Sequence, residues 1–71
     1  MDLTKAQQGT SYIISGINTD DEELNSFLFT LGCYIGEQIT IISVISDSYV
    51  VVIKDARYTI DKNLAECIIV D

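Results

Sequence analysis

Four consecutive acidic residues, Asp20, Asp21, Glu22 and Glu23, are the densest group of metal-ligating side chains in this sequence. Clustered carboxylates can bind hard divalent cations such as magnesium, calcium or manganese. Consecutive residues of a helix point in different directions, however, and acids in a first helical turn are favoured by the helix dipole. We therefore interpret these residues as the start of a helix and predict no metal site.

The two cysteines, Cys33 and Cys67, are the second candidates for chemistry. The sequence contains no histidine, which removes the commonest zinc patterns and the usual thiol–imidazole catalytic pair. Cys33 follows a glycine in a turn, so it is the more exposed candidate for iron ligation or oxidation. We expect free, partly buried thiols rather than a disulfide or a functional group.

Four tyrosines offer a third possibility, an aromatic surface for extended peptides. The alternative is that they are half-buried strand residues with solvated hydroxyl groups. These residues are Tyr12, Tyr34, Tyr49 and Tyr58. The chain has no glycine-rich phosphate loop, no nucleophile with its base and no diagnostic carboxylate pair, so we predict that it is not an enzyme.

A helix is predicted over residues 21–31, where it would position both the acids and the turn that follows. Thr19 and Glu22 have the spacing of a capping box, which marks the helix start. One set of apolar residues recurs with the 3.6-residue period of a helix, so we expect this face to be buried. Its members are Leu24, Phe27, Leu28 and Leu31.

Two glycines follow the helix and predict tight turns before the next strand. Gly32 suits the left-handed residue that ends a helix, and Gly36 suits a second turn. A single helical turn is also expected over residues 62–66, capped by Asp61.

Runs of β-branched and aromatic residues predict five strands around this helix. Gly16 indicates a bulge in the first strand, and the apolar alternation of the second slips at Ile41 and Ile42. The five strands are expected at residues 10–17, 38–46, 49–54, 57–60 and 67–70.

An open sheet of five such short strands would leave two apolar edges exposed to aggregation. We therefore predict a mainly β fold, a small closed five-stranded SH3-like barrel with one amphipathic helix after the first strand, lying across an open end. The 71 residues are expected to form a single domain, residues 1–71, with a small core.

Composition excludes several kinds of partner. Eleven acidic against four basic side chains give a net charge of −7, which repels nucleic acids and anionic lipids. The apolar runs are far shorter than the roughly 20 residues of a membrane helix. No signal peptide is recognisable, so we expect a cytoplasmic protein that does not insert into the membrane.

Several short motifs also occur in a characteristic order. They are Leu3, Gln8-Gly9, Leu31-Gly32-Cys33-Tyr34-Ile35-Gly36 after the helix, the Ile- and Val-rich residues 39–53, Tyr58-Thr59-Ile60, and Ala65-Glu66-Cys67-Ile68-Ile69-Val70. In order and spacing, the chain resembles the ferrous iron transport protein A (FeoA) family over essentially its whole length. The family pattern has Pro-Gly before the first strand and Leu-Gly-Leu-x-Pro-Gly after the helix.

The chain departs from the family pattern at a few positions. Gln8 and Ile35 stand where the family has proline, and Asp55 stands where it usually has glycine. The start of the helix is commonly basic in the family, but it is acidic here at Glu22 and Glu23. These departures affect the expected partner surface, because a partner that binds a basic helix start would be repelled by this acidic one.

The resemblance implies a small accessory protein of bacterial ferrous iron uptake that acts on the membrane GTPase-transporter FeoB by protein–protein interaction, without a cofactor. We expect Tyr34 and Ile35 to be pushed outward as apolar contacts, unless Ile35 plugs the end of the barrel. The predicted partner-binding residues are Leu31, Gly32, Cys33, Tyr34, Ile35 and Gly36.

Two alternative functions remain open. The chain is similar to the SH3-like domain at the carboxyl end of iron-dependent repressors, which implies metal sensing or peptide binding. The other alternative is a generic adaptor that binds a proline-rich or extended peptide.

Overall fold

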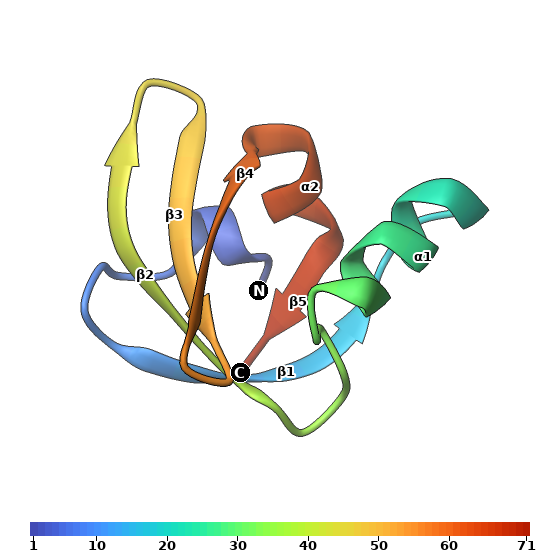
Figure 1. Ribbon diagram of the computed structural model, residues 1–71, viewed down its shortest axis with the longest axis horizontal. Helices are drawn as coiled ribbons and strands as arrows, with labels where there is room; N and C mark the ends of the chain where they lie inside the picture. The colour runs from blue at the N-terminus through green and yellow to red at the C-terminus, as the bar shows by residue number, and fades with distance from the viewer.

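A computed structural model describes all residues, Met1–Asp71, as five strands, two α-helices and one short 3-10 helix (Figure 1). All of the predicted strands are present, and their ends differ from the expected ones by single residues. The elements are η1 (Leu3–Lys5), β1 (Ser11–Ile17), α1 (Glu22–Thr30), β2 (Gln38–Ile45), β3 (Ser48–Ile53), β4 (Ala56–Asp61), α2 (Lys62–Cys67) and β5 (Ile68–Val70).

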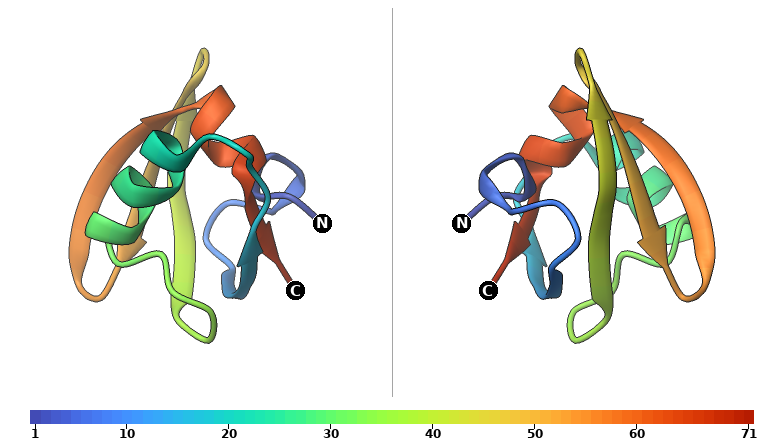
Figure 2. Two further views of the ribbon diagram at one scale, coloured as in Figure 1. Left: turned by 90° about the vertical axis from the view of Figure 1, so that its right-hand side faces the viewer. Right: turned by 90° about the vertical axis from the view of Figure 1, so that its left-hand side faces the viewer.

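The five strands form one antiparallel sheet in the order β4-β3-β2-β1-β5. The predicted closure into a barrel is wrong, because β4 and β5 are the two edges and do not pair with each other. The chain passes from one edge to the other through α2, which directly follows β4 and leads into β5 (Figures 1 and 2). A helix therefore occupies the place where closure would need a strand pair.

Two irregularities bend the sheet around its core, and both were expected from the sequence. The pairing of β1 with β5 shifts register between Ile14 and Gly16. The pairing of β2 with β3 shifts between Ile41 and Ser43. Bulges of this kind increase local twist and let a short sheet curl over its apolar face.

The concave side of the sheet holds the hydrophobic core. Leu3 of η1 and Ala65 of α2 are fully buried beside the inward-facing strand residues, so both short helices contribute to it. The cluster comprises Leu3, Ile14, Leu28, Cys33, Ile39, Ile41, Tyr49, Val51, Ile53, Ile60, Ala65, Ile68 and Val70. Asp61 caps α2 as predicted, since its carboxylate accepts a hydrogen bond of 2.9 Å from the Leu64 N–H.

Helix α1 begins differently from the prediction. The N-cap is Asp21, whose carboxylate accepts hydrogen bonds from the N–H groups of Glu23 and Leu24. The predicted capping box of Thr19 and Glu22 is therefore wrong. The Thr19 hydroxyl instead accepts a hydrogen bond from the N–H of Asp21, the N-cap residue itself. Aspartate is itself among the best N-cap residues, which explains the shift.

Only the last part of α1 contributes to the core. Leu28 is fully buried and Leu31 is half-buried, whereas Phe27 is 47% exposed. The prediction that the whole apolar face is buried is therefore wrong. The reason is the placement of α1, which projects from the end of β1 away from the sheet (Figure 1). The expected position across an open end of a barrel is not confirmed.

Candidate functional site

The segment Leu31–Gly36 is a tight turn that is fixed at both ends. Gly32 and Gly36 have φ angles of 97° and 94°, so Gly32 has the predicted left-handed conformation and Gly36 adopts it in the predicted second turn. At one end, the Cys33 N–H donates to the Leu28 carbonyl over 3.1 Å. At the other end, the Gly36 N–H donates to the Ile14 carbonyl of β1 over 2.8 Å. The turn is therefore tied to α1 and to the sheet.

The predicted contact residues in this turn differ in exposure. Ile35 is 77% exposed and does not plug the core, and Gly36 is exposed as well. Tyr34 is half-buried, so its expected outward position is only partly realised. The other members are Leu31, which is half-buried, and Gly32 and Cys33, which are buried.

Tyr34 is held between an aromatic ring and a cation. Its ring centre lies 4.5 Å from that of Phe29, with an angle of 56° between the ring planes. The ammonium group of Lys54 lies 4.5 Å from the centre of the same ring. Lys54 Nζ also lies 3.5 Å from Glu37 Oε1. These contacts fix the orientation of Tyr34 on the surface.

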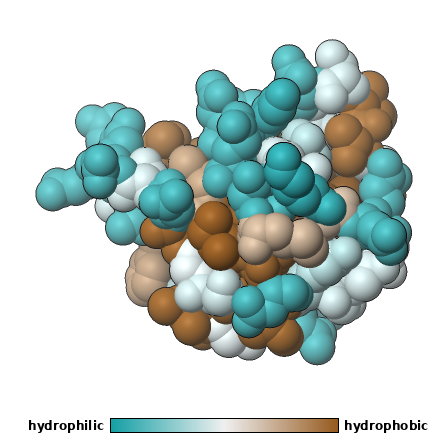
Figure 3. Space-filling view, turned by 180° about the vertical axis from the view of Figure 1, so that it is seen from behind, coloured by the Kyte–Doolittle hydropathy of each residue, from teal (hydrophilic) through white to brown (hydrophobic).

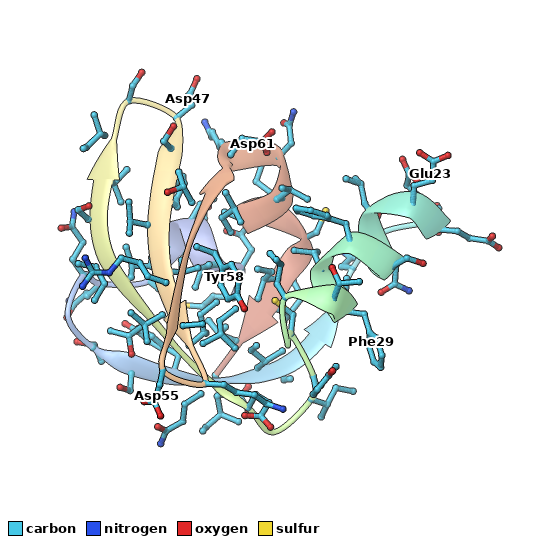
Figure 4. The ribbon with its side chains drawn as sticks, in the orientation of Figure 1. Glu23, Phe29, Asp47, Asp55, Tyr58 and Asp61 are labelled. Carbon is cyan, nitrogen blue, oxygen red and sulfur yellow. The ribbon has the colours of Figure 1, made fainter.

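An open apolar groove lies between α1 and this turn, with a volume of about 440 Å³. Phe29 is 60% exposed and points away from the sheet (Figure 4). Apolar side chains gather beside the hydrophilic projection formed by the start of α1 (Figure 3). The groove is lined by Ile17, Asn25, Phe29, Cys33, Tyr34 and Ile35.

The acidic residues at the start of α1 are all exposed. Glu23 points away from the rest of the molecule (Figure 4). No three histidine, cysteine or acidic side chains lie close enough to hold a metal ion together. None of the helices is both long enough and apolar enough to cross a membrane. The start of α1 is therefore an exposed, negatively charged segment of the same helix that contributes Asn25 and Phe29 to the groove.

Both cysteines are free, but their exposure is the reverse of the prediction. Cys33 is only 3% exposed, and burial raises its pKa to about 11. Cys67 is half-buried and donates its S–H to the Asn63 carbonyl over 3.3 Å. Cys33 turns inward because its N–H is bonded to the end of α1, which draws the residue toward the core. A protonated, buried thiol is a poor nucleophile and a poor metal ligand.

The other three tyrosines do not join Tyr34 in one surface. Tyr49 is buried, and Tyr58 points toward the inside of the sheet (Figure 4). The Tyr12 hydroxyl accepts a hydrogen bond from the Gln7 N–H over 3.0 Å. They are strand residues that serve the fold.

Sequence reasoning missed four residues of this site. Ile17, Asn25 and Phe29 line the groove, and Lys54 covers the Tyr34 ring. Phe29 lies outside the expected buried face of the helix, and this position was the available indication of its exposure. Lys54 belongs to a distant hairpin turn, so nothing in the local sequence connects it with Tyr34.

Comparison with solved structures places this fold among SH3-like proteins. The zinc complex of FeoA from Stenotrophomonas maltophilia, described as a prokaryotic SH3 domain protein, superimposes with a TM-score of 0.89 at 18% identity, covering 100% of this chain and 89% of that one. Iron(II) transport protein A from Clostridium thermocellum gives a TM-score of 0.91 at 29% identity, covering 100% of this chain and 44% of that one.

A different class of protein contains a similar domain. A manganese-dependent transcriptional repressor in complex with manganese matches with a TM-score of 0.91 at 15% identity, and this chain spans only 35% of its length. No curated protein matches by sequence. The family model described as "FeoA domain" matches residues 1–71. The chain therefore belongs to the FeoA family, which is linked to ferrous iron transport.

Proposed function

We propose that residues 1–71 act as one FeoA-like domain that binds the cytoplasmic part of the membrane ferrous iron transporter FeoB. Family membership supports a role in ferrous iron uptake. The domain works in the cytoplasm as an accessory protein and catalyses no reaction of its own. The partner surface is the groove beside α1 together with the turn Leu31–Gly36.

The observation that carries this proposal is the exposure of Ile35 on a rigid turn. Ile35 is 77% exposed, and Phe29 across the groove is 60% exposed. Apolar side chains that are fixed on a turn and adjoin an apolar groove are typical of a contact site. Tyr34, already oriented by Phe29 and Lys54, would lose little conformational entropy on binding.

The charge of the domain restricts the matching surface on the partner. The net charge is −7, and the exposed acids Asp20–Glu23 lie at the start of the helix that contributes Asn25 and Phe29 to the groove. A basic patch on the transporter's cytoplasmic part would be complementary to these acids, whereas nucleic acid would be repelled. Charges at the periphery of a contact mainly set orientation, association rate and salt dependence.

The test is a titration of the isotope-labelled protein with the cytoplasmic part of FeoB from the same organism. The decisive variant replaces Tyr34 and Ile35 together by serine. The matched control is Ile45→Ser, because Ile45 is 69% exposed but lies at the β2–β3 turn, at the opposite end of the molecule from the Leu31–Gly36 turn (Figure 2). NMR spectra establish first that both variants are folded.

We expect the double variant to bind at least about tenfold more weakly, a loss of about 1.4 kcal/mol or more. The Ile45→Ser control should bind like the parent protein. A folded double variant with unchanged affinity would remove the turn from the binding surface. Absence of any binding by the parent protein would reject FeoB as the partner.

The likeness to the metal-dependent repressor supports a second candidate, an SH3-like domain that takes part in metal sensing. The 15% identity supports the shared fold and nothing finer. Under this alternative, the parent protein would respond to manganese or iron(II) and would not bind the transporter. The same NMR spectra, recorded with each metal ion and then with the FeoB fragment, separate the two functions.

A further inference from the structure

One edge of the sheet is covered by another part of the chain, and the other edge is open. The outer edge of β5 is covered by the chain's own start, since Asp2 forms a bridge with Ile69 and the Val70 N–H donates to the Met1 carbonyl over 2.8 Å. The outer edge of β4 has no partner strand, no proline and no bulge. An open, regular edge strand of six residues can pair with another chain.

The register of the β3–β4 hairpin determines which backbone groups face outward on this edge. Lys54 and Asp55 have φ angles of 51° and 65°, as in a two-residue type I′ turn, so the flanking pair Ile53 and Ala56 closes the ladder. Hydrogen-bonded pairs alternate along an antiparallel ladder, so every second residue of β4 turns its N–H and C=O away from β3. These residues are Arg57, Thr59 and Asp61, of which Asp61 offers only its N–H because its carbonyl accepts the first hydrogen bond of α2.

The side chains of the same residues lie on the exposed face of β4. Arg57 makes no ion pair within the chain, although the chain carries 11 acidic residues. Arg57 and Asp61 are about 13 Å apart along the strand, too far to pair with each other. Each charge therefore lacks an opposite partner on its own strand.

We propose that two copies of this chain associate through their β4 strands, which run antiparallel with Thr59 of each copy facing Thr59 of the other. In this register, Arg57 of each copy lies opposite Asp61 of the second copy on the same face of the joined sheet. In this register the N–H and C=O of Thr59 pair with those of the second copy's Thr59, and the Arg57 carbonyl accepts from the Asp61 N–H of the second copy. The Asp61 carbonyl takes no part, because it accepts the first hydrogen bond of α2. Opposite charges that face each other across strands stabilise the pairing, and this contact is made twice.

Other registers are less favourable. A shift by one residue would place the outward backbone groups opposite inward ones. A shift by two residues in either direction would separate Arg57 from Asp61 of the second copy, so both opposite-charge pairs would be lost. The charges and the backbone alternation thus select the same register.

The association is expected to be weak. A single pair of edge strands buries less surface than the roughly 1,200 Å² at which stable interfaces begin. Two copies, each with a net charge of −7, also repel each other at longer range. We expect a dissociation constant between about 10 µM and about 1 mM. The interface uses none of the residues that line the groove, so it is independent of the proposed binding of FeoB.

Sedimentation equilibrium of the full chain from about 10 µM to about 1 mM tests the proposal. The average mass should rise above the monomer value of 7.9 kDa. Arg57→Asp and Asp61→Lys each place two like-charge pairs at the interface, so each variant alone should stay monomeric. An equal mixture of the two restores both opposite-charge pairs and should form the dimer again.

Asp61 also caps α2, so Asp61→Lys could disturb the fold. A second variant at this position is needed that preserves the cap. Asp61→Asn keeps a capping oxygen and removes only the charge, so it should weaken the dimer without unfolding α2. Thr59→Pro removes an outward N–H that is not hydrogen-bonded to β3. This variant should remain folded but should not associate. Dilution of the labelled parent protein should move NMR signals of residues 56–61 most.

Three results would overturn the proposal. The first is a parent protein that remains monomeric at about 1 mM. The second is dimerisation that survives both Thr59→Pro and Arg57→Asp. The third is a set of concentration-dependent NMR shifts centred on another surface, such as the groove. The second or third result would show that the copies associate through a different face. The first result would show that the β4 edge does not pair with a second copy of this chain.

Discussion

The ammonium group of Lys54 lies 4.5 Å from the centre of the Tyr34 ring, although the two residues belong to different turns of the chain. Lys54 is in the β3–β4 hairpin turn, and Tyr34 is in the turn that follows α1. The contact joins the two turns at one end of the molecule and gives Tyr34 a fixed orientation beside the groove.

Replacement of Lys54 by methionine should lower the free energy of unfolding by about 0.5–1 kcal/mol, the usual value of an exposed cation–π contact. Methionine keeps an unbranched apolar stem and removes the charge. The measurement is urea unfolding, together with the NMR shifts of the Tyr34 ring. Lys5→Met is the control, because Lys5 forms no ion pair and no aromatic contact. Equal effects of the two variants would show that the cation does not hold Tyr34.

Leu28→Ala should destabilise the protein by about 2–5 kcal/mol, the range for removing a buried leucine. Leu28 is fully buried and is the one residue of α1 in the core cluster. Phe27→Ala, one residue earlier in the same helix, should cost much less because Phe27 is 47% exposed. Urea unfolding of both variants measures the difference. A loss below about 1 kcal/mol for Leu28→Ala would contradict its burial in the core.

Cys33 should make stability depend on pH in the alkaline range. Burial raises its pKa from 9.0 to about 11, so the folded state holds the thiol proton more tightly than the unfolded state does. This contribution is fully present below about pH 9, falls as the pH rises toward 11, and amounts to at most about 2–3 kcal/mol. Cys33→Ala should lack this part of the pH dependence in unfolding experiments.

Alkylation provides a second measurement on the same residue. At neutral pH, iodoacetamide should modify the half-buried Cys67 before Cys33 in the folded protein. Mass spectrometry after proteolysis identifies the modified residue. Faster modification of Cys33 would mean that the turn opens readily to solvent.

Iron(II) should not bind tightly to this domain. The chain has no histidine, and no three potential ligands lie together. Anaerobic titration of the reduced protein, followed by NMR, should show no discrete shifts. Saturable shifts confined to Asp20–Glu23 or to Cys33 at low micromolar iron would disprove this prediction.

The strands and both helices could be predicted from local sequence because the governing interactions are local. β-Branched runs, the left-handed glycines at 32 and 36, and the Asp61 cap each act within a few residues. Both bulges could also be predicted, because an isolated glycine indicates the first and a slip in the apolar alternation indicates the second. Local patterns did not show how far α1 lies from the sheet, so the burial of Phe27 was predicted wrongly.

The sequence by itself therefore determined the order of the elements, the acidic character of the chain and the glycine-bracketed turn. Tertiary structure decided that the sheet stays open, because α2 carries the chain from β4 to β5 where a closed barrel would need a strand pair. It also decided that Cys33 is buried and that Lys54 covers Tyr34. These properties depend on contacts between residues that are distant in sequence, and no local propensity encodes such contacts.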